Sequence, residues 1–194
     1  MSRAPTILLC LGAALFGSIA WAHKTGERTP AEAGKPLARY TPTVRLVEQS
    51  LPSVASIQTL QVQEAPGVFT MGVGSASVIH GDGYLLTNEH VLKRMHQGQV
   101  LLPGRPQLPF RIIARMSSED LALIKVEAGE PLRPIPIGRS DDLMLGEPVL
   151  IIGNPGGLTH SVSMGIVSGL HRSTAVGGVF LPRMVQTSAA VSGG

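Results

Sequence analysis

His90 and Asp120 are the residues whose types and spacing point most directly to chemistry. His90 closes the stretch 72–92, which reads as a strand, a glycine-flanked turn at 81–83 and an apolar return strand. Asp120 lies 30 positions later, directly before the apolar run 121–126. Taken singly, such a histidine is more commonly a packing or surface residue, and such an aspartate a turn or cap residue. Together, with histidine first, they match two members of a Ser-His-Asp triad in which the serine comes last.

The elements that must position this pair are short strands separated by turn residues. Apolar alternation and β-branched content predict strands over Val54–Val62, Val68–His80, Tyr84–Thr87, Gln99–Leu102, Phe110–Met116 and Leu121–Val126. Few windows keep a helical period; 43–50 is either a short helix or an approach strand, and 91–96 a short turn. This spacing favours an antiparallel barrel over alternating βαβ units. Proline-rich residues 127–137 then predict a crossing to a second lobe, with strands over 148–153, 161–170 and 183–187.

The motifs around these residues resemble the HtrA/Deg family of trypsin-like serine proteases. The matching blocks are the Gly-Ser strand with DGYLLTNEHV around the histidine, DLALIKV around the aspartate, and then GEPVLIIGNPGG, SVSMGIVSGL and QTSAAV. They occur in the family's order over roughly residues 44–194. The resemblance implies an all-β, two-lobed chymotrypsin-like antiparallel β-barrel fold, with the N-terminal barrel over 44–128 and a partial C-terminal barrel over 129–194. It also implies a Ser-His-Asp endopeptidase that degrades misfolded exported proteins, with His90 as the base and Asp120 as its orienting carboxylate.

The nucleophile is the difficult member of the triad. Aligned without gaps to the family pattern, Gly194 matches the glycine that helps line the oxyanion hole, and the serine falls at position 196, beyond this chain. A rival alignment with a deletion makes Ser192 the nucleophile. Separately, Ser188 stands where the family pattern has aspartate. The first alignment predicts a chain that lacks the nucleophile and is inactive alone, with an incomplete second barrel. The alternatives are a non-catalytic peptide-binding protein on a protease scaffold, and an exported structural module in which His90 and Asp120 lie apart.

The N-terminal stretch is typical of an export signal. Arg3 precedes the 14-residue apolar run 7–20, and small residues flank Trp21, so 1–22 is predicted as a signal peptide and the protein as periplasmic or secreted. The run is short for a membrane span, which needs about 20 residues, so an uncleaved anchor is the minority alternative. Residues 23–43 have the composition of a flexible leader. Cys10 is the only cysteine, which excludes a disulfide within the chain.

The remaining composition argues against other functional classes. A formal charge of +3 without a Lys/Arg run gives no reason to expect a nucleic-acid partner. The glycine-rich stretch 153–157 lacks the Gly-Lys-[Ser/Thr] of a phosphate-binding loop and is expected to be a tight connection. No cofactor or metal is expected, since the histidines lack metal-ligand spacing. The expected partners are unfolded or misfolded polypeptides and, from the resemblance, copies of the chain itself in a homo-oligomer. The histidines left as surface or packing residues are His23, His80, His96, His160 and His171.

Overall fold

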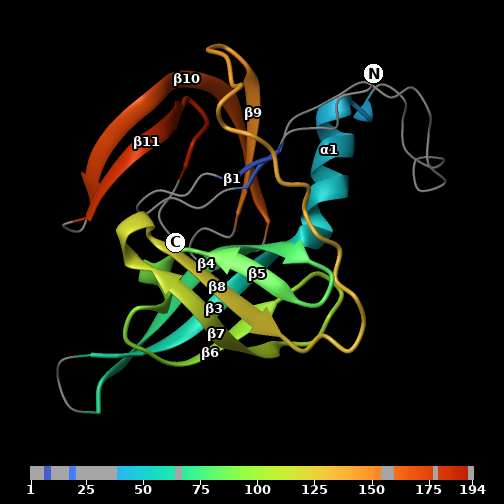
Figure 1. Ribbon diagram of the computed structural model, residues 1–194. Helices are drawn as coiled ribbons and strands as arrows, with labels where there is room; N and C mark the ends of the chain where they lie inside the picture. Colours follow the sequence, from blue (N-terminus) through green and yellow to red (C-terminus); the bar gives the residue numbers. More distant parts are fainter. Residues whose placement is uncertain are drawn as a thin grey trace.

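Two β-sheets make up the fold in the computed structural model, which describes residues 7–9, 18–20, 39–63, 67–153, 160–176 and 179–191. The first is a closed barrel with the strand order β3-β4-β5-β8-β7-β6. Figure 1 shows this barrel below and the second sheet above it, with helix α1 alongside. The barrel strands are β3 (Val54–Val62), β4 (Phe69–His80), β5 (Tyr84–Thr87), β6 (Met95–Leu101), β7 (Leu108–Met116) and β8 (Leu121–Val126). The structure therefore confirms the all-β, two-lobed fold expected from the sequence.

The barrel core is built from aliphatic side chains that alternate along the strands. In β8 every second residue, from Ala122 to Val126, is buried, as the sequence pattern requires of a strand with one face inside. Ile57, Val78 and Leu85 are fully buried in the same cluster. Burying each such side chain contributes about 1.5–3 kcal/mol. Because aromatic residues are scarce, this aliphatic packing supplies the stability that holds the barrel closed.

The tight turn predicted between β4 and β5 is present, and Gly83 shows why it needs glycine. Gly83 has φ of +89°, and a Cβ there would lie 2.3 Å from the carbonyl oxygen of Val126. The backbone of Gly83 instead accepts a hydrogen bond from the Val126 N–H at 2.9 Å. The turn is thus clamped to the end of β8, the strand that follows Asp120.

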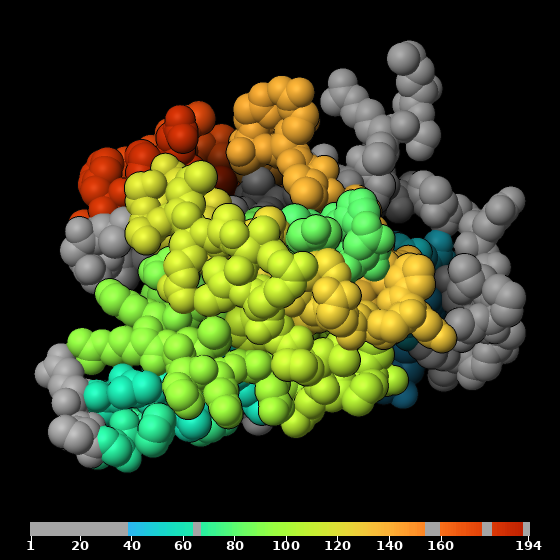
Figure 2. Space-filling model, turned by 60° about the horizontal axis from the view of Figure 1, so that its bottom comes forward, coloured from blue at the N-terminus to red at the C-terminus, as the bar shows by residue number. Residues whose placement is uncertain are grey.

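The proline-rich crossing after β8 is anchored to the barrel. The Leu132 N–H donates to the Gly81 carbonyl and the Ile135 N–H to the Val78 carbonyl, each at 2.8 Å. Both apolar side chains are buried, Leu132 at 5% and Ile135 at 3% exposure. Figure 2 shows this segment, in yellow-orange, lying against the green β4–β5 turn. The crossing is therefore bonded to the end of β4 and to the turn after it before the chain enters the second sheet.

The second sheet has the order β1-β2-β9-β10-β11. Its strands are β1 (Ile7–Leu9), β2 (Ser18–Ala20), β9 (Pro148–Gly153), β10 (Ser161–Val176) and β11 (Val179–Thr187). A small core of Val149, Ile151, Val167 and Ala189 lies on one face. β2 pairs antiparallel with β9, so the structure places strands inside the stretch predicted as an export signal rather than a fold element. The role of that stretch in export stays a prediction.

Helix α1 (Pro42–Ser50) settles the helix-or-strand alternative for this segment in favour of the helix. The Thr41 side chain caps it by accepting a hydrogen bond from the Val44 N–H at 3.3 Å. Leu46 packs against Leu150 of β9 in a cluster separate from the two main cores. None of the helices in the described residues is both long and apolar enough to cross a bilayer.

The structure also corrects some predicted boundaries. The short turn predicted over 91–96 is wrong in its second half, because Met95 and His96 begin β6. β6 starts early because Met95 pairs with Gln61 of β3, a contact that local pattern does not reveal. β10 and β11 likewise extend beyond the predicted strands, because they pair with each other as far as Val176 and Val179.

Candidate active site

His90 lies in the 3₁₀ turn η4 (Glu89–Leu92), which follows β5 directly. Val91 and Leu92 of this turn are buried at 5% and 0% exposure and hold it to the barrel. The turn packs tightly on β4 at Gly74, where an added Cβ would lie 2.6 Å from a methyl carbon of Val91. The glycine of the Gly-Ser strand therefore makes room for the turn, and the buried residues on its far side leave His90 at the surface.

Asp120 lies between the 3₁₀ turn η5 (Ser117–Glu119) and β8. Its backbone is left-handed, with φ 52° and ψ 44°, and its N–H bonds to the Ser117 carbonyl at 3.3 Å. Aspartate and asparagine enter this region more readily than most residues, because their short polar side chains bond locally. The tight turn reverses the chain between β7 and β8 and directs the Asp120 carboxylate toward η4.

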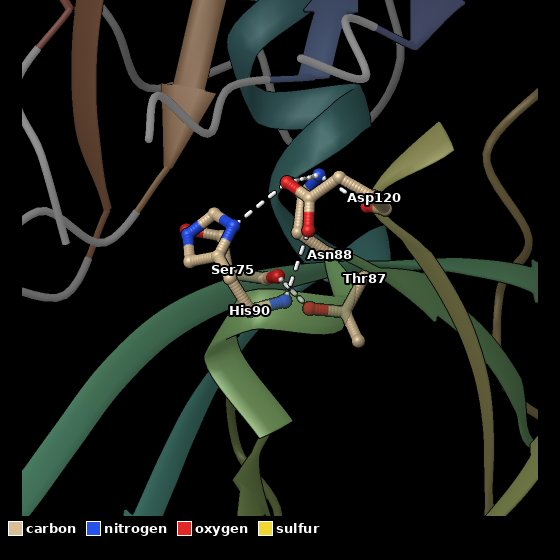
Figure 3. A network of polar contacts seen from close by, with 5 residues as sticks. All are labelled: Ser75, Thr87, Asn88, His90 and Asp120. Carbon is tan, nitrogen blue, oxygen red and sulfur yellow. Dashed lines mark hydrogen bonds and ion pairs between the residues drawn. The ribbon is translucent and has the colours of Figure 1, made fainter. Parts of the chain in front are cut away.

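The two side chains meet across the barrel rim. His90 Nδ1 lies 2.7 Å from Asp120 Oδ2, and the His90 backbone N–H donates to Oδ1 at 2.9 Å. Figure 3 shows the imidazole and the carboxylate facing each other in this arrangement. Because a carboxylate oxygen accepts, the network assigns the ring proton to Nδ1, which places the basic lone pair of the neutral ring on Nε2.

Burial differs between the two partners. The Asp120 side chain is 9% exposed and the His90 side chain 41% exposed. The carboxylate is therefore fixed among backbone and side-chain donors, while the imidazole edge can meet a reactant. That division suits an orienting carboxylate and a proton-transferring imidazole.

Asn88 is a site residue that the sequence reasoning missed. Its side-chain Nδ2 donates to the Asp120 backbone carbonyl at 2.6 Å and to Asp120 Oδ2 at 2.8 Å. The Glu89 N–H donates to the same carbonyl at 3.1 Å. The available signal was a polar residue two positions before His90, directly after the strand that ends at Thr87.

Arg115 of β7 secures the outer side of the same turn. Its guanidinium pairs with the Glu89 carboxylate at 2.8 Å and donates to the Leu92 carbonyl at 3.3 Å. The Arg115 side chain is 38% exposed, so the ion pair contributes little to stability. Its effect is geometric, because it ties η4 to the strand that leads to Asp120.

The other predicted site residues, Ser192 and Gly194, lie outside the described residues. The segment just before them is bound to β10 by two hydrogen bonds of Ser188, one from its backbone and one to its side chain. The Ser188 N–H donates to the Ile166 carbonyl at 3.1 Å, and the Ile166 N–H donates to Ser188 Oγ at the same distance. Ser188, which stands where the family pattern has aspartate, thus serves as an anchor for the chain in this structure.

The remaining histidines lie away from the pair. His80 is 64% exposed and contacts Asp82 at 3.4 Å, and the ring of His96 lies 5.9 Å from that of Phe69. His23 is outside the described residues, His160 directly precedes β10 and His171 lies within that strand. Within the described ranges, no three histidine, cysteine or acidic residues are grouped to hold a metal ion.

A closed six-stranded antiparallel barrel beside a second sheet, with a His-Asp pair at the barrel rim, defines a chymotrypsin-like protein. Comparisons with known proteins agree. The family model described as a trypsin-like peptidase domain matches residues 74–194. The chain is 34% identical over 204 aligned residues to the chloroplastic Protease Do-like 1 of Arabidopsis thaliana, covering 98% of this chain and 46% of that protein.

One further match is a bacterial relative, and another is a solved structure. A probable periplasmic serine endoprotease, DegP-like, of Ectopseudomonas mendocina (strain ymp) is 36% identical over 91% of this chain and 36% of its own length. The solved structure titled "HtrA-type protease AlgWS227A with tripeptide" aligns with a TM-score of 0.68 and 32% identity, over 76% of this chain and 46% of that one. The chain belongs to the family of trypsin-like peptidase domains, and within it to the HtrA/Deg type. It spans less than half the length of these relatives.

Proposed function

We propose that this chain carries the general base of a serine endopeptidase, with His90 as the base and Asp120 as its orienting carboxylate. The observation that supports this most directly is the 2.7 Å contact between His90 Nδ1 and Asp120 Oδ2. The carboxylate fixes the Nδ1–H tautomer and stabilises the imidazolium that forms during the reaction. The ring nitrogen that transfers protons is then Nε2.

The reaction proceeds in two proton-coupled stages. A serine Oγ attacks the peptide carbonyl carbon while its proton moves to His90 Nε2, and the carbonyl oxygen becomes an oxyanion. Backbone N–H donors, with Gly194 as one of them, stabilise the oxyanion, each by roughly 2.7–4 kcal/mol. His90 then gives the proton to the leaving amine, and the acyl-enzyme remains. Water then attacks the ester carbonyl carbon while its proton moves to His90 Nε2. The bond between this carbon and the serine Oγ breaks, the proton passes to Oγ, and the carboxylic acid product leaves.

The nucleophile is proposed at position 196 of the translated sequence, two residues after Gly194, from the ungapped alignment to the family pattern. Ser192 is the rival, and it requires a deletion in the oxyanion loop. The proposed substrates are unfolded or misfolded exported polypeptides, and the proposed location is periplasmic or secreted. The relatives named periplasmic support this location, and so does the signal-like stretch 1–22.

The test measures cleavage of a denatured, fluorescently labelled protein by the protein translated through the region after position 194. His90→Ala and Asp120→Asn should each lower kcat by several orders of magnitude, about 10⁴-fold for the aspartate change because the wrong tautomer is favoured. His80→Ala is the matched control, since His80 also contacts an aspartate but is 64% exposed and lies outside the site. Equal activity in His90→Ala would remove this residue from the mechanism. Binding of the denatured protein without cleavage would instead support a peptide-binding protein.

Labelling with a serine-reactive fluorophosphonate identifies the nucleophile. In the longer protein we expect the label on serine 196, with labelling lost in His90→Ala. Label on Ser192 in the 194-residue chain, lost in Ser192→Ala, would support the rival alignment and overturn the assignment to position 196.

A further inference from the structure

Asn88 contacts Asp120 in a way that the catalytic roles of His90 and Asp120 do not require. The Asn88 side chain is fully buried, at 0% exposure. One nitrogen, Nδ2, donates both to the Asp120 backbone carbonyl at 2.6 Å and to carboxylate Oδ2 at 2.8 Å. The amide therefore connects the main chain and the side chain of the same residue.

The carboxylate oxygen that Asn88 contacts is the one that faces the imidazole. Oδ2 accepts from Asn88 Nδ2 and lies 2.7 Å from His90 Nδ1, while Oδ1 accepts from the His90 backbone N–H. Three donors thus fix the carboxylate in position and in rotation about its terminal bond. Without Asn88, the two remaining donors would both belong to His90. The Asp120 carboxylate could then rotate together with the imidazole ring.

The backbone contact has a second effect. Asp120 occupies the left-handed region, at φ 52° and ψ 44°, which aspartate enters more readily than most residues but less readily than glycine. The Asp120 carbonyl accepts from Asn88 Nδ2 and from the Glu89 N–H. These two donors hold the peptide group of this residue and hence the direction in which its side chain leaves the backbone.

Asn88 is kept at a cost to stability. Its Oδ1 atom is buried and has no hydrogen-bond partner in the described part of the chain. A buried acceptor that loses its bonds to water destabilises the fold. Turning the amide over would place this oxygen against the oxygens of Asp120, so the observed orientation follows from the network itself. Packing alone does not explain an amide here, because an apolar side chain would avoid the penalty.

We propose that Asn88 is a positioning residue that holds the Asp120 carboxylate so that Oδ2 keeps His90 in its Nδ1–H tautomer. The proposal rests on the proposed function, in which this His-Asp pair transfers protons. It assigns Asn88 no contact with substrate. Its effect passes through Asp120 to the ring nitrogen that must be basic.

The test is ¹⁵N NMR of the histidine rings in the full 194-residue chain, which reports the tautomer without any turnover. Neutral His90 should carry its proton on Nδ1 in the unaltered protein and show a mixture of Nδ1–H and Nε2–H forms in Asn88→Ala. The matched control is Thr87→Val. Thr87 is the adjacent residue, is 1% exposed and donates to the Ser75 carbonyl at 2.8 Å, with no bond to Asp120 among those described. The control should leave the His90 tautomer unchanged. An unchanged tautomer in folded Asn88→Ala would overturn the proposal, and so would an equal loss in Thr87→Val.

A second measurement needs no substitution and decides the matter if Asn88→Ala does not fold. As the His90 ring is titrated in the unaltered protein, the Asn88 side-chain amide signals should shift with the same midpoint, because both groups bond Oδ2. Amide signals that stay fixed while the ring titrates would refute the proposal.

In an active longer protein, Asn88→Ala should lower kcat at unchanged KM. The loss should lie between tenfold and the roughly 10⁴-fold caused by the wrong tautomer. The NMR outcomes do not depend on proteolysis, so a failure of the endopeptidase function would leave them interpretable.

Discussion

Gly165→Ala should detach the segment that leads to the proposed oxyanion loop. Gly165 lies in β10, and a Cβ added there would come within 2.2 Å of the Ala189 backbone nitrogen and 2.7 Å of the Ala189 Cα. These are main-chain atoms, so no side chain can rotate away to relieve the overlap. Residues 188–191 would have to move by roughly 1 Å or more, which takes a 3.1 Å hydrogen bond outside its normal range.

The hydrogen bonds that this substitution would break set the size of the expected loss in local stability. Two bonds of 3.1 Å join Ser188 and Ile166, and Ser163 Oγ donates to the Ala190 carbonyl at 2.5 Å. Each such bond contributes about 0.5–1.5 kcal/mol net. Because Ala189 also leaves the small core of the second sheet, we expect the local free energy of opening to fall by about 2–4 kcal/mol.

Native-state hydrogen exchange at the Ile166 and Ser188 amides is the assay. Both should exchange faster in Gly165→Ala, while amides of the first barrel keep their protection. Gly81→Ala is the matched control, because an added Cβ there would meet nothing nearer than the Leu132 carbonyl oxygen at 3.5 Å. Equal protection of Ser188 in the two variants would refute the reasoning from close approach.

Two further predictions concern stability and charge. Ile124→Ala, at a fully buried position of the barrel, should lower the free energy of unfolding by about 2–5 kcal/mol in denaturant titration. Ile113→Ala, at a position that is 39% exposed, should lower it far less. Equal losses in the two variants would contradict the assigned core. The hydrogen bond and charge of Arg139 lower the pKa of the Asp141 carboxyl, so Arg139→Ala should raise that pKa in an NMR pH titration, and an unchanged value would show that the contact does not persist in solution. Since both groups are fully exposed, we expect no measurable loss of stability from the second change.

Much of the barrel was predictable because most of its strands have a recognisable local sequence pattern. β3, β5 and β8 in the barrel and β9 in the second sheet begin and end where the sequence pattern predicts, β9 from a continuous apolar run rather than from alternation. β6 was harder, since its first residues carry no alternation and join the sheet only by pairing with β3. The local sequence pattern predicts a strand whose side chains pack on a core. It does not predict a strand that forms because its backbone pairs with a neighbouring strand.

The residues of the site also differ in how well the sequence predicted them. His90 and Asp120 were found from residue type, order and the apolar strands beside them, and the structure brings the two within hydrogen-bond distance. Asn88 was not found, because its role depends on reaching a residue 32 positions away. Nothing in the letters around it distinguishes that contact from a simple end-of-strand polar residue.

The sequence by itself determined which side chains could do chemistry, the strands that precede and follow them, and the family to which the chain is similar. Tertiary structure decided the 2.7 Å meeting of imidazole and carboxylate, the left-handed backbone of Asp120 and the bridging amide of Asn88. The physical reason is that hydrogen bonds depend on fractions of an ångström and on angles. For residues 30 positions apart, those quantities are fixed only when the barrel closes and the two rim turns are packed against it.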